Sequence, residues 1–239
     1  MKTAILVDGG FYRRMANHYV GAIPAIDRAK ELALYCRKHL LQKDLYVKDD
    51  KGKRYEYSEL YRVFYYDCPP TDKNVFHPLK KSSINFKKQP TYTWMTEFLD
   101  ALKSKRKFAL RLGFLAADEA SFTLKPDILK KLFNGSKGIS DVTESDFVLT
   151  LQQKGVDMKI GLDIASLAYK HLVDQIVLVS GDSDFTPAAK LARMEGIDFI
   201  LDPMGHKVND FLLEHVDGLR SYYSMLKHDL KDEDASFAS

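Results

Sequence analysis

The sequence predicts an α/β protein whose mostly parallel sheet carries helices on both faces. Short apolar runs alternate with stretches of helical periodicity, most clearly over the last hundred residues. The first run, residues 3–8, is almost continuously apolar and stops at Asp8-Gly9-Gly10, as expected of a buried parallel strand. Strand–helix–strand order implies right-handed crossovers, and therefore parallel neighbours in one sheet.

The other elements follow from local composition and periodicity. Aromatic and β-branched residues indicate strands over residues 61–67, 108–115, 147–151, 175–180 and 197–201. Helical spacing of apolar residues indicates helices over residues 24–42, 93–103, 126–133, 156–171, 184–195, 207–213 and 215–226. The polar, lysine-bearing residues 71–93 indicate a loop or an insert. We expect one domain over residues 1–226 and a polar, disordered tail over residues 227–239.

Composition limits the class of protein. The 239 residues, 45% of them hydrophobic, are enough for a real core, and the net charge of +3 does not by itself indicate nucleic-acid binding. No apolar run is long enough to cross a membrane or to form a signal peptide. Cys36 and Cys68 lack metal-site spacing, so we expect reduced structural cysteines and a cytoplasmic location.

Four aspartates are predicted to meet at one edge of the sheet. Asp8 ends the first strand, and Asp182 and Asp184 follow the strand at 175–180. Asp157 begins the helix after the short strand at 147–151, which we place in the same sheet. Ligands of open α/β sheets bind beyond the carboxyl ends of the strands. Carboxylates crowded there need a cation, and Mg²⁺ or Mn²⁺ prefers such oxygen ligands and can promote phosphodiester hydrolysis.

A purely structural interpretation of these acids stays open. Aspartate before a helix is a common N-cap, and Asp157 and Asp184 occupy cap-like positions. Asp8 before two glycines could simply close a turn. Asp163 lies about 240° round the helix from Asp157, so we expect a supporting or surface role for it rather than direct metal binding.

Three blocks of this sequence resemble the NYN domain, a PIN-like nuclease fold, and in particular its LabA-like bacterial branch. They are residues 6–11 (LVDGGF), 154–165 (KGVDMKIGLDIA) and 178–185 (LVSGDSDF), and residues 215–219 (HVDGL) are also similar. The resemblance implies a Rossmann-like sheet and a Mg²⁺- or Mn²⁺-dependent endoribonuclease site formed by Asp8, Asp157, Asp182 and Asp184. It gives supporting positions to Lys154, Ser180 and Ser183. Many relatives have an asparagine in the turn after the first aspartate, where this chain has Gly10, Phe11 and Tyr12.

Basic residues are concentrated between positions 80 and 111, a stretch that contains nine lysines and arginines and only two acidic residues. Aromatic residues are interleaved with them, a pattern typical of single-stranded RNA binding, although the same aromatics also suit core positions. The best candidates for RNA contact are Lys80, Lys81, Lys87 and Lys88. Arg13 and Arg14 follow Asp8 closely in the sequence, so they could bind the scissile phosphate or simply lie on the surface of a helix.

Two other functions remain open at this stage. The domain could be a non-catalytic RNA- or protein-binding regulatory module that keeps its aspartates for structure. A haloacid-dehalogenase-like phosphatase also begins with a strand-terminal aspartate, but its general acid two residues later would here be Gly10. The sequence leaves open the RNA substrate, the number of metal ions, a homo-oligomer and a regulatory protein partner.

Overall fold

A six-stranded parallel sheet forms the centre of the fold in a computed structural model that describes residues 1–43 and 55–223. Its strand order is β14-β13-β12-β1-β4-β7, and every neighbouring pair is parallel. The strands are β1 (Lys2–Asp8), β4 (Glu59–Asp67), β7 (Phe108–Leu112), β12 (Gln175–Val179), β13 (Asp198–Asp202) and β14 (Gly218–Leu219). The predicted α/β class with a parallel sheet is confirmed. The predicted tail, residues 227–239, lies outside the described residues.

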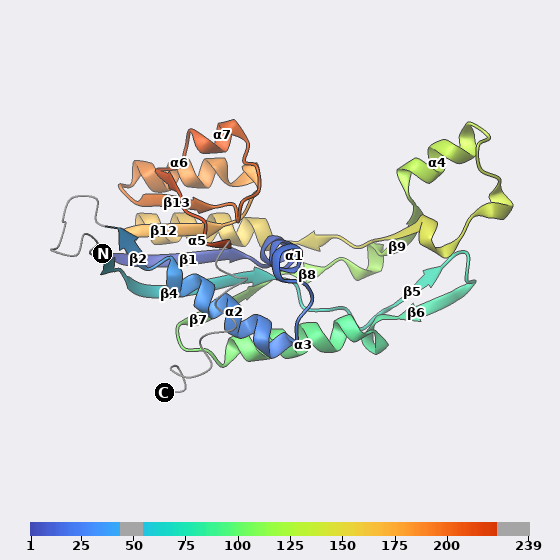
Figure 1. The fold of residues 1–239 in the computed structure, drawn as a ribbon, viewed down its shortest axis with the longest axis horizontal. Helices are drawn as coiled ribbons and strands as arrows, with labels where there is room; N and C mark the ends of the chain where they lie inside the picture. Colours follow the sequence, from blue (N-terminus) through green and yellow to red (C-terminus); the bar gives the residue numbers. More distant parts are fainter. Residues whose placement is uncertain (44–54, 224–239) are drawn as a thin grey trace. The chain divides into compact units, whose positions relative to one another are not determined.

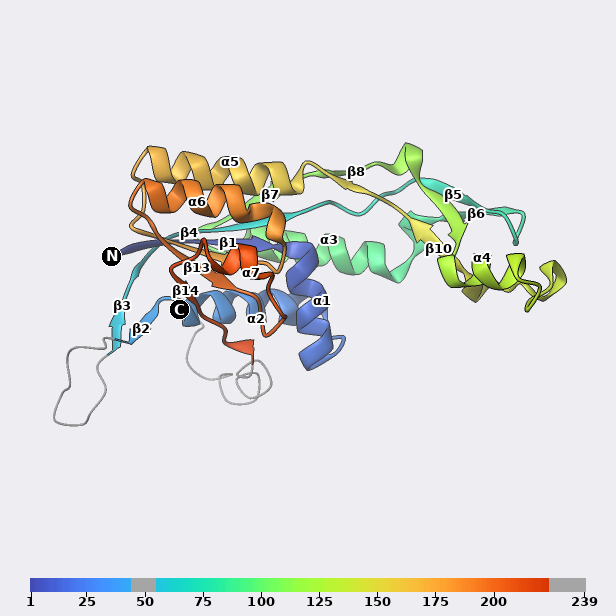
Figure 2. The same cartoon turned by 90° about the horizontal axis from the view of Figure 1, so that it is seen from above.

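Helices cover both faces of this sheet. The helices α1 (Gly9–Val20) and α2 (Ala25–Lys38) lie on one face, and α5 (Val156–Tyr169) and α6 (Thr186–Met194) run side by side on the other (Figure 1, Figure 2). The short helix α7 (Asp210–Leu213) precedes the edge strand β14. In the described part of the chain, no helix is long and apolar enough to cross a membrane.

The core lies around the two central strands. The side chains of residues 4–7 in β1 and of residues 176–179 in β12 are completely buried. These central residues of both strands form apolar runs because helices cover both faces of the sheet, so none of their side chains points to water, whereas Lys2 at the start of β1 is exposed. The core therefore fixes the ends of β1 and β12, where the predicted site begins.

The chain divides into two compact units. The first contains the sheet and consists of residues 1–67, residues 97–112 and the described residues from Gly155 onward. The second consists of residues 68–96 and 113–154. Helix α3 (Pro90–Lys103) contributes residues to both units. The single-domain boundaries predicted from the sequence stay a prediction.

The second unit is built from three small antiparallel pairs, one complete helix and the start of α3. The pairs are β5 (Asn74–His77) with β6 (Ser82–Asn85), β8 (Phe114–Leu115) with β11 (Gln153–Lys154), and β9 (Ser121–Leu124) with β10 (Phe147–Thr150); the helix is α4 (Pro126–Phe133). Its small core includes the buried His77, whose ring lies 4.5 Å from Phe122 and 5.0 Å from Phe147 between ring centres.

Several predicted elements are wrong in place or kind. The strand at 147–150 pairs with β9 and is not part of the central sheet. Residues 71–93, predicted as a loop or insert, are not an irregular loop, since they hold the β5–β6 hairpin and the start of α3; that they form an insert stays a prediction. The helix predicted over 215–226 is absent from its described part, 215–223, where β14 completes the sheet edge. Helix α1 was not predicted, because its opening Gly9-Gly10 indicates a turn when read locally.

A buried polar network joins α1 to the end of β4. Arg13 donates from Nε and Nη2 to the two oxygens of Asp67, at 2.9 and 3.0 Å, and the Tyr65 hydroxyl donates to the same carboxylate at 2.8 Å. Gly9 lies directly against this network. A Cβ at Gly9 would lie 2.6 Å from Asp67 Oδ2 and closer still to the Tyr65 ring and hydroxyl.

We therefore predict that Gly9→Ala lowers the free energy of unfolding by about 1–3 kcal/mol, because the buried network has to move. Gly161→Ala is the matched control, since a Cβ there meets no atom within 4 Å and the site is helical. That variant should be neutral or gain up to about 1 kcal/mol. Urea unfolding of both variants measures the difference, and equal stabilities would contradict the packing described here.

Candidate active site at the carboxyl edge of the sheet

Asp8 anchors the site at the end of β1. It is the last residue of the strand and the N-cap of α1, where its Oδ1 accepts from the Phe11 amide at 3.0 Å. The side chain is half-buried, and burial raises its pKa above the ordinary aspartate value. The second carboxylate oxygen, Oδ2, faces the neighbouring strand β12.

The segment after β12 meets Asp8 through Ser180. The buried Ser180 hydroxyl lies 3.4 Å from Asp8 Oδ2, to which it donates, and accepts from the Asp182 amide at 3.2 Å. Asp182 in turn caps the 3-10 turn Ser183–Phe185 (η5), since its Oδ1 accepts from the Asp184 amide at 3.0 Å. One serine therefore links the two acidic segments, which lie more than 170 residues apart in the sequence.

Asp157 reaches the same edge from α5. Gly155, in the left-handed region at φ 81°, is the N-cap of α5, and Asp157 follows in its first turn. Burial raises the pKa of Asp157, and the charges of Asp182 and Asp184 raise it further. Asp157 likewise contributes to the raised pKa of Asp8. The four predicted aspartates therefore lie close enough together to repel one another's charge.

The route by which Asp157 was predicted to reach this edge is wrong, since the strand at 147–150 lies outside the sheet. Asp157 instead arrives because α5 crosses β1, β4 and β7 and begins near η5. The sequence predicted cap-like positions for Asp157 and Asp184, and this prediction is also wrong. Asp8 and Asp182 are the N-caps, whereas Asp157 and Asp184 cap no helix.

The four side chains offer carboxylate oxygens, which are the type of ligand atom that a hard divalent cation prefers. Within residues 1–43 and 55–223, no three Asp, Glu, His or Cys side chains are close enough to enclose a metal ion. In the same part of the chain, no lysine, arginine or histidine forms an ion pair with any of the four aspartates. Their mutual repulsion therefore has no compensating protein charge among the described residues.

Two further aspartates end strands at this edge and were missed from the sequence. Asp67 ends β4 and is bound by Arg13 and Tyr65, as described above. Asp202 ends β13, where its buried carboxylate accepts from the Tyr35 hydroxyl and from the Met204 amide and lies 2.8 Å from His39 Nε2. The signal was available, since each aspartate closes an apolar run as Asp8 does.

The supporting residues fall in different places. Asp163 accepts from the Tyr66 hydroxyl at 2.8 Å and from Arg111 Nε at 3.0 Å, so it ties α5 to β4 and β7. Lys154 lies in the second unit and pairs with Glu119 at 2.5 Å. The Ser183 carbonyl accepts from the Thr186 hydroxyl at 2.6 Å at the start of α6. Of these supporting residues, Ser180 alone has a described contact with the aspartate cluster.

The two arginines on α1 have different surroundings. Arg13 is held by Asp67 in the buried network, with both ends of its guanidinium fork in use. Arg14 is exposed and lies over the Phe11 ring, with its guanidinium carbon 5.7 Å from the ring centre. Arg14 is therefore the arginine with more freedom to meet a phosphate.

The four predicted RNA-binding lysines lie in the second unit, and all are exposed. Lys80 and Lys81 form the turn between β5 and β6, and Lys80 pairs with Glu144 at 2.7 Å. Lys87 and Lys88 lie in a 3-10 turn, Phe86–Lys88 (η1), which is capped by Asn85. Their contact with RNA stays a prediction.

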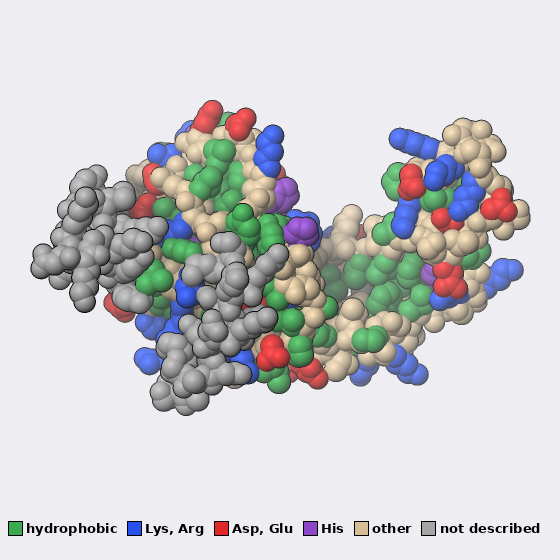
Figure 3. All heavy atoms as spheres, in the orientation of Figure 1, with side chains coloured by type: hydrophobic (Ala, Val, Ile, Leu, Met, Phe, Trp, Pro, Cys, Tyr) green, Lys and Arg blue, Asp and Glu red, His purple; other side chains and the backbone are tan. Residues whose placement is uncertain are grey.

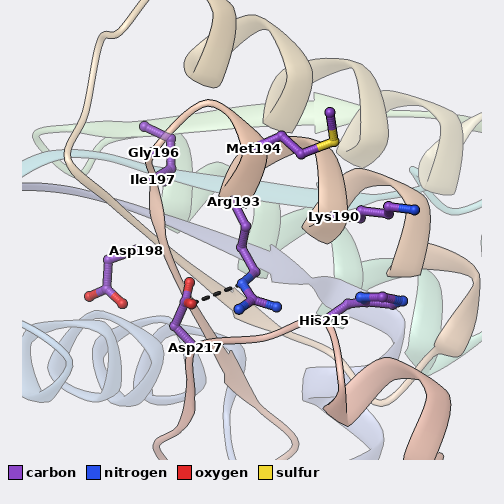
Figure 4. Close-up of a pocket in the computed structure, with 8 residues that line it drawn as sticks. All are labelled: Lys190, Arg193, Met194, Gly196, Ile197, Asp198, His215 and Asp217. Atoms are coloured by element: carbon purple, nitrogen blue, oxygen red, sulfur yellow. Dashed lines mark hydrogen bonds and ion pairs between the residues drawn. The ribbon is translucent and has the colours of Figure 1, made fainter.

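A shallow groove of about 660 Å³ lies elsewhere in the first unit, between the end of α6 and the start of β13 (Figure 4). Arg193 spans it and donates to Asp217 Oδ1 at 2.9 Å, while Asp217 Oδ2 accepts from the Phe199 amide at 2.8 Å. Asp198, the first residue of β13, also lines it. The groove is thus at the amino ends of the strands, and Asp217 of the 215–219 block has a structural role there.

Comparison with known proteins decides the family. The family model described as the NYN domain matches residues 73–212, more than half of the chain. The chain belongs to the NYN domain family. This is a family of PIN-like nucleases, and the α/β sheet described above is consistent with that fold. The LabA-like branch is not distinguished by this match.

Other comparisons add little to the NYN assignment. A crystal structure of a protein of unknown function from Vibrio parahaemolyticus is similar over 92% of this chain and 91% of its own, at 14% identity and a TM-score of 0.44. Comparison with curated protein sequences gave no significant match.

The raised pKa of Asp8 gives a prediction for stability against pH. The folded state holds the Asp8 proton more tightly than the unfolded state, so ionisation at Asp8 costs stability as pH rises through the raised value. Asp8→Asn removes this cost and keeps an N-cap oxygen. We expect its gain over wild type in unfolding free energy to be larger at neutral pH than below about pH 3, where aspartates are protonated.

The control for this measurement is Asp27→Asn, which changes an aspartate on α2 whose side chain is 48% exposed and pairs with Lys30 at 3.5 Å. Urea unfolding at both pH values gives the two differences for each variant. If Asp8→Asn gains the same unfolding free energy at both pH values, ionisation of Asp8 does not lower the stability of the folded state.

Proposed function

We propose that this NYN domain is a divalent-metal-dependent endoribonuclease, with Asp8, Asp157, Asp182 and Asp184 as the metal-binding residues. The observation that carries the proposal is the convergence of these carboxylates from three distant segments on one edge of the sheet. Asp8 and Asp157 have raised pKa values there, in part because of the neighbouring acids. A bound Mg²⁺ or Mn²⁺ would relieve this repulsion, polarise a phosphodiester and lower the pKa of an attacking water.

The chain's own residues hold the donors in place. Asp8 and Asp182 each have one oxygen tied to a backbone amide, which fixes the direction of the other. Ser180 spans these two segments, so it positions both carboxylates without being a ligand itself. Asp157 and Asp184 have no capping duty, which leaves both their oxygens available to a cation.

We further propose that single-stranded RNA lies along the basic surface of the second unit. Lys80, Lys81, Lys87 and Lys88 are exposed and suited to phosphates. Lysine side chains also gather over α4 (Figure 3), where Lys130 and Lys131 are exposed. Phe98, one of the aromatic residues between positions 80 and 111, is completely buried and belongs to the core.

A second candidate is a non-catalytic RNA- or protein-binding module. The hydrogen bonds of Asp8 and Asp182 to backbone amides favour it, because both aspartates would then have structural roles without a metal. Cleavage and metal binding, measured separately, distinguish the two candidates.

We predict that Asp157→Asn and Asp182→Asn each reduce Mn²⁺-dependent cleavage of a labelled single-stranded RNA by about 100-fold or more. The loss of a ligand removes several kcal/mol of charge stabilisation in the transition state. Asp27→Asn, purified in parallel, should cleave like wild type. If wild type and the two site variants degrade the RNA equally, the nuclease is a contaminant. Titration calorimetry with Mn²⁺ that shows no binding to wild type would instead favour the non-catalytic module.

We also predict that replacing Lys80, Lys81, Lys87 and Lys88 together by alanine weakens RNA binding and flattens its salt dependence. Each lost phosphate contact should lower the slope of log K against log salt by about 0.7 for a single strand. Fluorescence anisotropy with a labelled RNA in Ca²⁺ measures binding without relying on cleavage. A matched variant with Lys2, Lys30, Lys103 and Lys190 replaced keeps the same net charge. Equal slopes for the two variants would exclude the predicted lysines from the RNA path.

A further inference from the structure

The Phe11 ring connects separate segments of the chain beside the aspartate cluster. Phe11 lies in the first turn of α1, where its amide donates to Asp8 Oδ1 at 3.0 Å. Its ring packs directly on Gly181, since a Cβ at that glycine would lie 2.7 Å from Phe11 Cε2. Gly181 immediately precedes Asp182 in the sequence. Side chains that lie on the Phe11 ring are therefore neighbours of both acidic segments.

Two side chains of types that bind nucleotides lie on this ring. The His206 ring stacks on Phe11, with 6.3 Å between ring centres and 22° between ring planes. The guanidinium carbon of Arg14 lies 5.7 Å from the centre of the same ring. Phe11 is only 5% exposed, whereas Arg14 and His206 are both exposed. Neither side chain forms a hydrogen bond or an ion pair with another described residue, so the polar groups of both are available to a ligand.

The turn after β13 fixes the position of His206. The amide of the buried Met204 donates to Asp202 Oδ1 at 2.7 Å, and the His206 amide donates to the Pro203 carbonyl at 2.7 Å. Met204 and Gly205 both have left-handed backbone conformations, at φ 47° and 78°. A residue other than glycine keeps such a conformation only where its surroundings determine it. His206 is therefore presented by a closed turn that is attached to the buried end of β13.

This arrangement suits an unpaired nucleotide. Proteins recognise single-stranded RNA largely by stacking its bases on aromatic rings, including those of histidine, and an arginine fork matches a phosphate. The neighbouring aspartates repel a phosphate, so a strand that reaches them needs a positive charge close by. Arg14 supplies this charge, and His206 supplies a ring that is supported on Phe11.

We propose that His206 and Arg14 bind one nucleotide of single-stranded RNA beside the candidate metal site, with the base stacked on His206 and the phosphate held by Arg14. This inference rests on the proposed nuclease function and deepens it, since it names an unpaired nucleotide as the substrate at this edge. A base inside a duplex is already stacked and paired, so it offers no free face to the His206 ring. The nuclease therefore selects RNA that is unpaired next to the position of cleavage.

Binding of a labelled single-stranded RNA in Ca²⁺, followed by fluorescence anisotropy, tests the two roles separately. We expect His206→Ala to weaken binding about 5- to 100-fold, because one stacked base is lost, and His206→Phe to bind like wild type. Arg14→Ala should lower the slope of log K against log salt by about 0.7. The matched controls His171→Ala and Arg62→Ala change exposed side chains just before β12 and in the first half of β4, and both should bind like wild type.

Three results would overturn the proposal. They are a wild type that binds no RNA, a His206→Ala variant that binds as wild type does, and a His206→Phe variant that binds as weakly as His206→Ala. Urea unfolding of each variant separates a loss of binding from a loss of folding. Because both His206 and Arg14 are exposed, we expect their variants to unfold at the same urea concentration as wild type.

Replacement of single bases by abasic ribose tests the stacking itself. We expect one position at which the abasic RNA binds wild type more weakly but binds His206→Ala as well as the intact RNA does. Equal losses in both proteins at every position contradict base stacking. Neither measurement involves cleavage, so the expected binding without Mn²⁺-dependent cleavage would refute the proposed nuclease and support this nucleotide site. Cleavage by wild type together with unchanged binding by His206→Ala would refute this site alone.

Discussion

The pairing of β1 with β12 determines where the candidate active site forms. Their register places Val7 opposite Val179, so the next residues, Asp8 and Ser180, emerge side by side at the carboxyl edge. No local feature of either segment could bring them together over so long a separation in the chain. The pairing is stable because residues 4–7 of β1 and 176–179 of β12 are completely buried, and burial of a large apolar side chain contributes about 1.5–3 kcal/mol. The position of the acids therefore follows from the apolar core.

The carboxylates at this edge are of two kinds. Asp67 and Asp202 are buried and satisfied, the first by Arg13 and Tyr65 and the second by several donors that include the Tyr35 hydroxyl. Asp8, Asp157, Asp182 and Asp184 are more accessible and form no ion pair within the described residues. A buried carboxylate without donors would be very costly, so satisfied acids at this edge are those that maintain the fold. The acids that repel one another without compensation are those available to a cation.

The sequence was informative where a residue's neighbours along the chain determine its position. Asp8 and Asp182 were placed correctly because each follows an apolar strand, and strand ends in a parallel sheet share an edge. Asp157 was predicted for the wrong reason, because β10 has the same length and apolar character as a sheet strand although it pairs with β9. Asp67 was missed although it closes an apolar run as Asp8 does; only its pairing with Arg13, which neutralises it, leaves no periodic signal in the sequence.

Helix α5 shows how several functions can be combined in one element. Its buried face, including Ile160 and Ile164, packs on the sheet, and Asp163 fixes the helix to Tyr66 and Arg111. These contacts determine where the first turn lies, so they set the position of Asp157 near Asp182 and Asp184. Asp163 can therefore support a metal site without touching a metal, by holding the helix that presents Asp157. The outward face of the same helix, with the exposed Met158 and Leu162, takes no part in these contacts.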